Sequence, residues 1–162
     1  MVRCFSRNEY KTILIDSLHF CQKEKGMEIF ACCIMTNHVH LVFRSVNELK
    51  PELLLGDFKR FTRRAILKAI EDNPRESRKE WLLEQFRKAT QKSTNTSNYQ
   101  FWRHNNKLIE LWSNKVVFEK IIYVHNNPVE EGIVFRAEEY LYSSARDYVG
   151  IKGNVDNIII VR

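Results

Sequence analysis

The sequence predicts an α+β domain in which a small, mainly antiparallel sheet carries helices on one side. Two short apolar runs, rich in β-branched and aromatic residues, meet within residues 29–43 and are typical of two buried, paired strands. In several other stretches the apolar residues recur at helical spacing. The chain contains no internal repeat, and its 162 residues suffice for one sizeable core, so we interpret residues 1–162 as a single domain.

The first helix is expected between Ser6 and Gly26. Ser6 is an N-cap candidate with Glu9 three residues later, which is the pattern of a capping box. Gly26 is typical of the residue that follows the last helical turn. The apolar face of this helix is predicted to consist of Tyr10, Ile13, Leu14, Leu18 and Cys21.

The two predicted strands follow, and they join at Thr36 and Asn37. Because successive side chains of a strand point to opposite faces, His38 and His40 project from the same side. Two neighbouring imidazoles at one strand end have a spacing that suits a single metal ion. The alternative is a pair of core or turn histidines whose ring nitrogens bind backbone groups.

A second helix is predicted over residues 51–71, with Pro51 in its first turn. Its inner side should hold Leu54, Phe58, Phe61, Ala65 and Ala69, and its other side is basic, with Lys59, Arg60, Arg63, Arg64 and Lys68. Arg60, Arg64 and Lys68 form one row of like charges, which lowers helix stability unless a counter-charge is supplied. This pattern favours a phosphate-binding surface; a solvated face paired with scattered acids is the alternative.

A third helix is expected over residues 75–92, with Trp81, Leu82, Gln85 and Phe86 as its apolar stripe. Residues 93–98 are typical of a loop. Residues 99–104 then form a strand or an extended segment, and residues 108–112 a strand. Trp102 and Trp112, with Arg103 and His104, are candidates for stacking on unpaired bases, whereas core packing of both tryptophans is the alternative.

The last long helix is predicted over residues 114–127, capped by Ser113 and ended by Pro128. Its buried arc should comprise Val117, Phe118, Ile121, Ile122, Val124 and His125. Tyr123 points away from that arc, in one row with Glu119 and Asn127. A tyrosine beside a short amide suits a nucleophile next to a metal ligand, and an amphipathic tyrosine at the edge of the core is the alternative. Short helices at residues 138–148 and an edge strand at residues 158–161 follow.

The net charge of +6, from 26 Lys and Arg against 20 Asp and Glu, favours a polyanionic partner. No segment reaches the roughly 20 apolar residues of a membrane span, and no leader opens the chain, so we expect an intracellular, cytoplasmic protein without a membrane partner. Cys32 and Cys33 should point to opposite faces, and all four cysteines are expected to be reduced. A zinc site that joins Cys32 or Cys33 to the two histidines is a further hypothesis.

Residues 33–43 (CIMTNHVHLVF) and 123–134 (YVHNNPVEEGIV), followed by YSSA at 142–145, resemble the REP-associated tyrosine transposases of the single-tyrosine HUH superfamily. The resemblance covers nearly the whole chain and implies a ferredoxin-like fold that cuts and rejoins single-stranded DNA. It implies that His38, His40 and Asn127 bind a Mg²⁺ or Mn²⁺ ion and that Tyr123 is the nucleophile. The implied partner is a folded-back, palindromic hairpin DNA element.

This chemistry is physically consistent. A cation held by two imidazoles and an amide oxygen keeps open positions at which it polarises the scissile phosphate. A phenol needs such help, because its ordinary pKa is about 10. Attack by Tyr123 would yield a 5′-phosphotyrosine and a 3′-OH, so the bond energy is kept for rejoining. Tyr142 is the reserve candidate for the nucleophile.

One departure from the family pattern is the short N-terminus, since the relatives have a strand before the first helix. In a ferredoxin-like sheet that strand is central, and its loss leaves a neighbour unpaired. Three arrangements are consistent with this: a degraded or trimmed copy, a replacement segment such as residues 155–161, or a homodimer. The alternative function is therefore a catalytically inactive derivative that only binds hairpin or single-stranded DNA.

Overall fold

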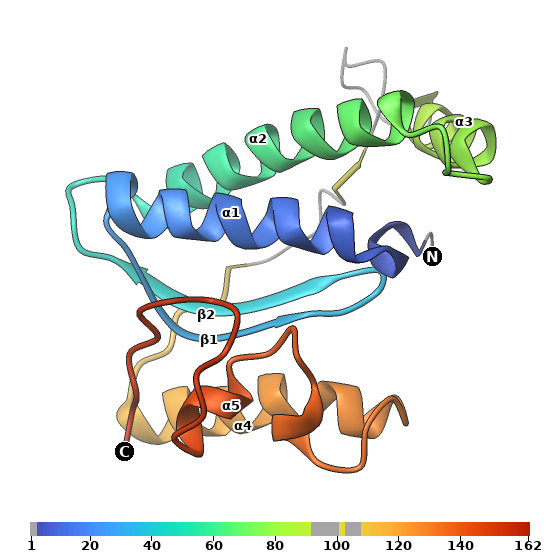
Figure 1. Ribbon diagram of the computed structural model, residues 1–162. Helices are drawn as coiled ribbons and strands as arrows, with labels where there is room; N and C mark the ends of the chain where they lie inside the picture. Colours follow the sequence, from blue (N-terminus) through green and yellow to red (C-terminus); the bar gives the residue numbers. More distant parts are fainter. Residues whose placement is uncertain (1–2, 92–100, 103–107) are drawn as a thin grey trace.

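The computed structural model describes residues 3–91, 101–102 and 108–162. Its two strands are consecutive and lie in the first third of the chain, with helices before and after them (Figure 1). In order they are η1 (Cys4–Ser6), α1 (Asn8–Lys25), β1 (Met27–Ile34), β2 (Val39–Ser45), α2 (Pro51–Asp72), α3 (Lys79–Gln91), α4 (Asn114–Glu130), η2 (Ala137–Glu139) and α5 (Ala145–Tyr148). None of these helices is long and apolar enough to cross a membrane.

The sheet consists of β1 and β2, which pair in antiparallel fashion, and the predicted α+β class is confirmed. Cys33 lies opposite His40, and the register shifts once, between Ile29 and Ala31. The order α1, β1, β2, α2 is that of a ferredoxin-like fold without its first strand. In the part of the chain that the structure describes, no strand precedes α1.

Helices cover both faces of the sheet, so the prediction that they lie on one side was wrong (Figure 1). α1 and α2 cover one face, and α4 covers the other. The reason lies in β1, whose side chains are apolar and buried in both directions: Ile29, Cys32 and Ile34 on the α1 side, and Ala31 and Cys33 on the α4 side. A strand that is apolar on both faces has to be covered twice.

The edge of β1 that does not pair with β2 is covered by the C-terminal part of the chain. The amide of Ile34 donates to the carbonyl of Tyr142 at 2.8 Å, and the amide of Ser144 donates to the carbonyl of Cys32 at 2.9 Å. The amide of Ile159 donates to the carbonyl of Ile29, also at 2.9 Å. The prediction of an edge strand at residues 158–161 was wrong, because these residues do not form a strand. The segment nevertheless forms a hydrogen bond with this edge of β1.

α1 begins one residue later than predicted. Its N-cap is Arg7, without a capping side chain, and Ser6 belongs to η1. The Ser6 hydroxyl instead accepts a hydrogen bond from the Arg78 guanidinium at 2.7 Å, which explains why the capping box does not form. Gly26 ends the helix as predicted, in the left-handed conformation with φ of 69°.

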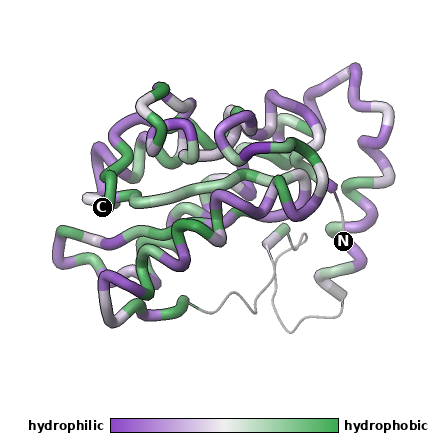
Figure 2. The backbone as a smooth tube through the Cα atoms, turned by 90° about the horizontal axis from the view of Figure 1, so that it is seen from below, coloured by the Kyte–Doolittle hydropathy of each residue, from purple (hydrophilic) through white to green (hydrophobic). Residues whose placement is uncertain are grey.

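α2 buries a stripe that differs from the predicted one. Leu54 and Phe58 are buried as expected, but Phe61 is 57% exposed. The stripe continues at four-residue intervals through Thr62 and Ile66. Thr62 was overlooked because it is polar; its hydroxyl donates to the carbonyl of Phe58 at 2.8 Å and so loses no hydrogen bond on burial. Figure 2 shows hydrophilic and hydrophobic residues alternating along the helices.

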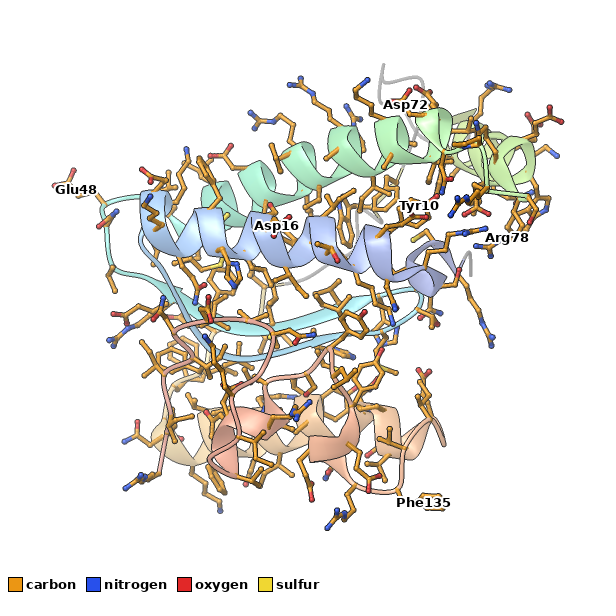
Figure 3. The ribbon with its side chains drawn as sticks, in the orientation of Figure 1. Tyr10, Asp16, Glu48, Asp72, Arg78 and Phe135 are labelled. Atoms are coloured by element: carbon orange, nitrogen blue, oxygen red, sulfur yellow. The ribbon has the colours of Figure 1, made fainter. Side chains whose placement is uncertain are left out.

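α3 begins at Lys79, later than predicted, because the preceding residues surround the buried carboxylate of Glu76. Glu76 accepts hydrogen bonds from the Tyr10 hydroxyl at 3.1 Å and from the backbone amide of Arg78 at 3.1 Å. The guanidinium of Arg7 lies 2.8 Å from the same carboxylate. Figure 3 shows Tyr10 and Arg78 at one end of the molecule, where α1 meets the connection between α2 and α3.

The segment between α3 and α4 contains no strand in its described residues, so the strand predicted at residues 108–112 was wrong. Phe101 and Trp102 pack against Phe5 in the core. Trp112 is 82% exposed, so core packing was the wrong alternative for this residue. The predictions for residues 93–98, 99–100 and 103–104 lie outside the described residues.

α4 extends through Pro128 to Glu130 and is longer than predicted. Pro128 lies in the last turn, where the missing amide removes only one helical hydrogen bond. Ile121, Val124 and His125 are buried as expected, but Phe118 and Ile122 are 43% and 44% exposed. The two-stranded sheet covers only part of the apolar surface of α4, so Phe118 and Ile122 at its margin remain exposed.

Candidate active site

Two imidazoles stand side by side where β2 begins. The ring centroids of His38 and His40 are 4.7 Å apart, as strand alternation requires. The Nδ1 of His38 lies 2.6 Å from the side-chain oxygen of Asn37, which fixes the plane of its ring. The turn between the strands is closed by the Met35 amide, which donates to the His38 carbonyl at 2.9 Å.

α4 brings a phenol and an amide to the same place. Ser113 caps the helix as predicted, since its hydroxyl accepts the Val116 amide at 3.3 Å. The ring centroid of Tyr123 is 5.4 Å from that of His40. The Oδ1 of Asn127 is 3.3 Å from the Nε2 of His38. The four side chains from two distant parts of the sequence are therefore brought together, and their chemical roles stay predictions.

Tyr123 and Asn127 differ in burial. Tyr123 is 46% exposed, whereas Asn127 is buried with 8% exposed. The row formed by Glu119, Tyr123 and Asn127 thus lies at the edge of the buried side of α4 and does not point directly away from it. This edge position allows one helix to present a phenol to solvent and an amide to the histidines.

The Nε2 of His40 is buried and has no hydrogen-bond partner among the described residues. Burial, and to a lesser extent the neighbouring His38 ring, lower the pKa of His40 to about 4. The ring is therefore neutral at neutral pH, with one nitrogen able to offer a lone pair to an electrophile. A buried nitrogen without a partner carries a free-energy cost that a bound cation would remove.

The donor atoms present fit a divalent cation. If the Nδ1–H of His38 donates to Asn37, the Nε2 of His38 carries a lone pair that faces the Oδ1 of Asn127. Two facing acceptors repel each other unless a cation lies between them. Imidazole nitrogen and amide oxygen are ligands for Mn²⁺ and, less well, for Mg²⁺. Between Arg3 and Arg162, the described residues contain no group of three His, Cys, Asp or Glu side chains that could hold a metal ion.

The hypothesis of a zinc site with Cys32 or Cys33 is not supported. Burial raises the pKa of each of the two thiols to about 12, which disfavours the thiolate form that zinc binds. Their side chains also belong to different faces of the sheet, as predicted, and all four cysteines are free and buried.

Comparison with protein families gives one match that bears on this site. Residues 3–100 match the family described as IS200-like transposases. The chain belongs to this family. As an IS200-like transposase it is a DNA-cutting enzyme, and its partner is DNA. The matched region contains His38 and His40 and ends before α4, so Tyr123 and Asn127 lie outside it. Comparisons with curated proteins and with solved structures give no match.

In this transposase a third histidine, His125, links α4 to the sheet. The Nε2 of His125 lies 2.9 Å from the hydroxyl of Ser144, and that hydroxyl accepts the backbone amide of Cys32 at 2.9 Å. Burial lowers the pKa of His125 to about 4, so this ring is neutral as well. The sequence indicated that His125 is buried, but a partner 19 residues away carries no sequence signal.

The basic residues belong to α2, which lies on the other side of the sheet from α4, the helix that carries Tyr123 and Asn127 (Figure 1). Two members of the row have acidic neighbours: Arg60 lies 3.3 Å from Asp57, and Lys68 lies 2.9 Å from Asp72. These pairs supply the counter-charge that the row needs. A DNA-binding role for Lys59, Arg60, Arg63, Arg64 and Lys68 stays a prediction.

Trp102, another described candidate for DNA binding, is partly buried. Its indole N–H donates to the carbonyl of Lys59 and to the hydroxyl of Thr62, both at 3.1 Å. The ring also packs against Phe58. These contacts are those of the core-packing alternative. Arg103 and His104 lie outside the described residues.

Proposed function

We propose that this transposase cuts and rejoins single-stranded DNA, folded as a hairpin, with Tyr123 as the nucleophile. The observation that carries the proposal is the contact between the rings of Tyr123 and His40. It places the exposed Tyr123 side chain beside the two imidazoles that we propose as metal ligands. A phosphodiester that reaches the hydroxyl of Tyr123 also reaches the region in front of the histidines.

The proposed step exchanges one phosphodiester for another. The phenolic oxygen of Tyr123 attacks the scissile phosphorus, a Tyr123 Oη–P bond forms, and the P–O3′ bond breaks. The phenol gives up its proton, and the departing 3′ oxygen takes one and becomes a 3′-OH. The 5′ side of the cut stays attached to Tyr123 as a phosphotyrosine. Attack by a 3′-OH on this linkage reverses the step, so rejoining needs no external energy.

His38, His40 and Asn127 are the residues that would hold a Mg²⁺ or Mn²⁺ ion. When bound, the ion supplies Lewis-acid polarisation of the scissile phosphate. All three side chains are neutral donors, so they leave the charge of the ion available to the phosphate. The hydrogen bond between His38 and Asn37 orients the His38 ring, in the way that outer partners commonly orient metal-binding histidines.

A covalent-adduct assay tests the proposal. The purified protein is mixed with a labelled single-stranded hairpin oligonucleotide in Mg²⁺ or Mn²⁺, and the products are separated under denaturing conditions. We expect a protein–DNA adduct that requires the metal and that Tyr123→Phe abolishes. The matched control is Tyr142→Phe, since Tyr142 is the reserve candidate, and this variant should form the adduct as the wild type does.

Other outcomes would contradict the proposal. Binding of the hairpin without any adduct in either metal would favour the inactive DNA-binding derivative. An adduct that survives Tyr123→Phe and disappears in Tyr142→Phe would move the nucleophile to Tyr142. An adduct of full yield in the presence of EDTA would remove the metal from the mechanism.

A further inference from the structure

Lys120 lies next to Tyr123 on α4. Its ammonium nitrogen is 5.7 Å from the centroid of the Tyr123 ring, and its side chain is exposed. Lys120, Tyr123 and Asn127 follow one another at intervals of three and four residues, so they share one side of the helix. The ammonium therefore lies beside the phenol on the side of α4 that also carries the amide.

Lys120 has no acidic partner in the described part of the chain. Within residues 3–91, 101–102 and 108–162, no carboxylate forms an ion pair with it. Lys11, by contrast, is buried, donates to the Tyr140 hydroxyl at 3.3 Å and lies over the ring of Tyr142 at 4.2 Å. Lys11 is thus committed to the core, and Lys120 is available to a ligand.

The reaction at Tyr123 creates a need for such a cation. A phosphodiester carries one negative charge, and charge builds up on its non-bridging oxygens as the fifth bond to phosphorus forms. Preorganised cations aimed at these oxygens are a principal source of catalysis in phosphoryl transfer. The basic row belongs to α2, which lies on the other side of the sheet from α4 (Figure 1).

We propose that Lys120 binds the phosphate on which Tyr123 acts. Its ammonium contacts a non-bridging oxygen of the scissile phosphodiester, and then the same oxygen in the phosphotyrosine linkage. This role rests on the proposed function of Tyr123. It makes Lys120 a substrate-binding residue of the active site, in addition to the metal ligands and the nucleophile.

The test compares Lys120→Gln with the wild type in single-turnover adduct formation on the hairpin oligonucleotide. Loss of one charge-assisted hydrogen bond to the phosphate should slow the reaction on the order of tenfold to a hundredfold. Lys120→Arg keeps the charge and should recover most of the rate. The matched control is Lys115→Gln, an exposed lysine five residues earlier on another side of α4, which should react at the wild-type rate.

An oligonucleotide that is neutral at the scissile position shows whether Lys120→Gln removes a contact with that phosphate or disturbs α4 as a whole. The cut position is mapped on the wild-type adduct, and an oligonucleotide with a neutral methylphosphonate at that position is prepared. Lys120→Gln should weaken binding of the normal oligonucleotide relative to the wild type and leave binding of the methylphosphonate unchanged. Equal weakening of both, or a wild-type reaction rate, would overturn the role of Lys120 alone. Absence of an adduct with the wild type would overturn the proposed function and this role with it.

Discussion

His40 combines two properties that rarely occur together at a structural histidine. Its Nε2 is buried without a partner in the described part of the chain, and the ring is neutral because burial lowers its pKa to about 4. A histidine that served only packing would be expected to have its buried nitrogen hydrogen-bonded. His125 is such a residue, since its Nε2 is 2.9 Å from the Ser144 hydroxyl. The contrast between the two rings is the reason for assigning metal binding to His40.

A metal-binding role for His40 predicts a metal-dependent thermal stability. At 100 times its dissociation constant, Mn²⁺ should raise the melting temperature of the wild type by about 5–10 °C. His40→Ala should lose this increase, and His19→Ala, which changes a histidine on α1, should keep it. Differential scanning calorimetry with and without Mn²⁺ measures both. An equal increase in wild type and His40→Ala would place the ion elsewhere.

Glu76 is a buried carboxylate that accepts hydrogen bonds and forms ion pairs. Burial alone would raise the pKa of this carboxyl, but hydrogen bonds from the Arg78 amide and the Tyr10 hydroxyl, with the charges of Arg7 and Arg78, outweigh burial and lower it. A carboxyl whose pKa is lower in the folded state stabilises the fold above its unfolded pKa. That contribution disappears as the pH falls through the folded pKa.

Glu76→Gln should therefore lower the free energy of unfolding at pH 7 by roughly 1–3 kcal/mol, the usual cost of unpairing buried charged groups. The difference from the wild type should be constant between pH 6 and 8 and should shrink below the ordinary pKa of 4.5. Urea unfolding at a series of pH values measures it. A difference that grows on acidification would contradict the assigned direction of the pKa shift.

Substitution by alanine should have opposite effects on stability at two glycines, one at the end of α1 and one inside α2. Gly26 ends α1 with φ of 69°, and a Cβ there would collide with the side chain of Asn47, so Gly26→Ala should destabilise the protein by about 1–2 kcal/mol. Gly56 lies within α2, where a Cβ would meet nothing within 4 Å. Gly56→Ala should stabilise the protein by about 0.5–1 kcal/mol. Urea unfolding of the two variants checks the signs, and a shift of the same sign in both would refute this account.

Elements with strong local signals were predictable from the sequence, and elements that depend on distant partners were not. The end of α1 at Gly26 and the cap of α4 at Ser113 are local and were predicted correctly. The start of α1 was missed because Ser6 binds Arg78, which is 72 residues away. The strand expected near Trp112 failed because apolar composition alone does not supply a pairing partner.

For the molecule as a whole, the resemblance to the tyrosine transposases implied which residues meet, whereas the number of layers was not predicted. Alternation in β2 and the spacing in α4 indicated His38 and His40 on one side and Tyr123 with Asn127 on another. That α4 covers the second face of the sheet follows from the burial of β1 in both directions. The uniformly apolar run of β1 already indicated this burial, since a one-sided strand would alternate apolar with polar residues, but the prediction of helices on one side did not use it. Lys120 was overlooked because a single lysine on a helix carries no pattern.

One buried hydroxyl links the two halves of the site by hydrogen bonds. α4 carries Tyr123 and Asn127, the hairpin carries the histidines, and Ser144 links α4 to β1 through His125 and the amide of Cys32. Ser144→Ala leaves a buried amide and a buried imidazole nitrogen unpaired, so it should lower the free energy of unfolding by about 1–3 kcal/mol.

Native-state hydrogen exchange locates this effect. In Ser144→Ala the amide of Cys32 should exchange faster relative to global unfolding, because its acceptor is gone. The amide of Ile159, which binds the carbonyl of Ile29 on the same edge of β1, serves as the internal control and should keep its protection relative to global unfolding. Equal loss of protection at both amides would mean that the whole edge opens as a unit. The register between α4 and the hairpin would then depend on apolar packing and not on this hydroxyl.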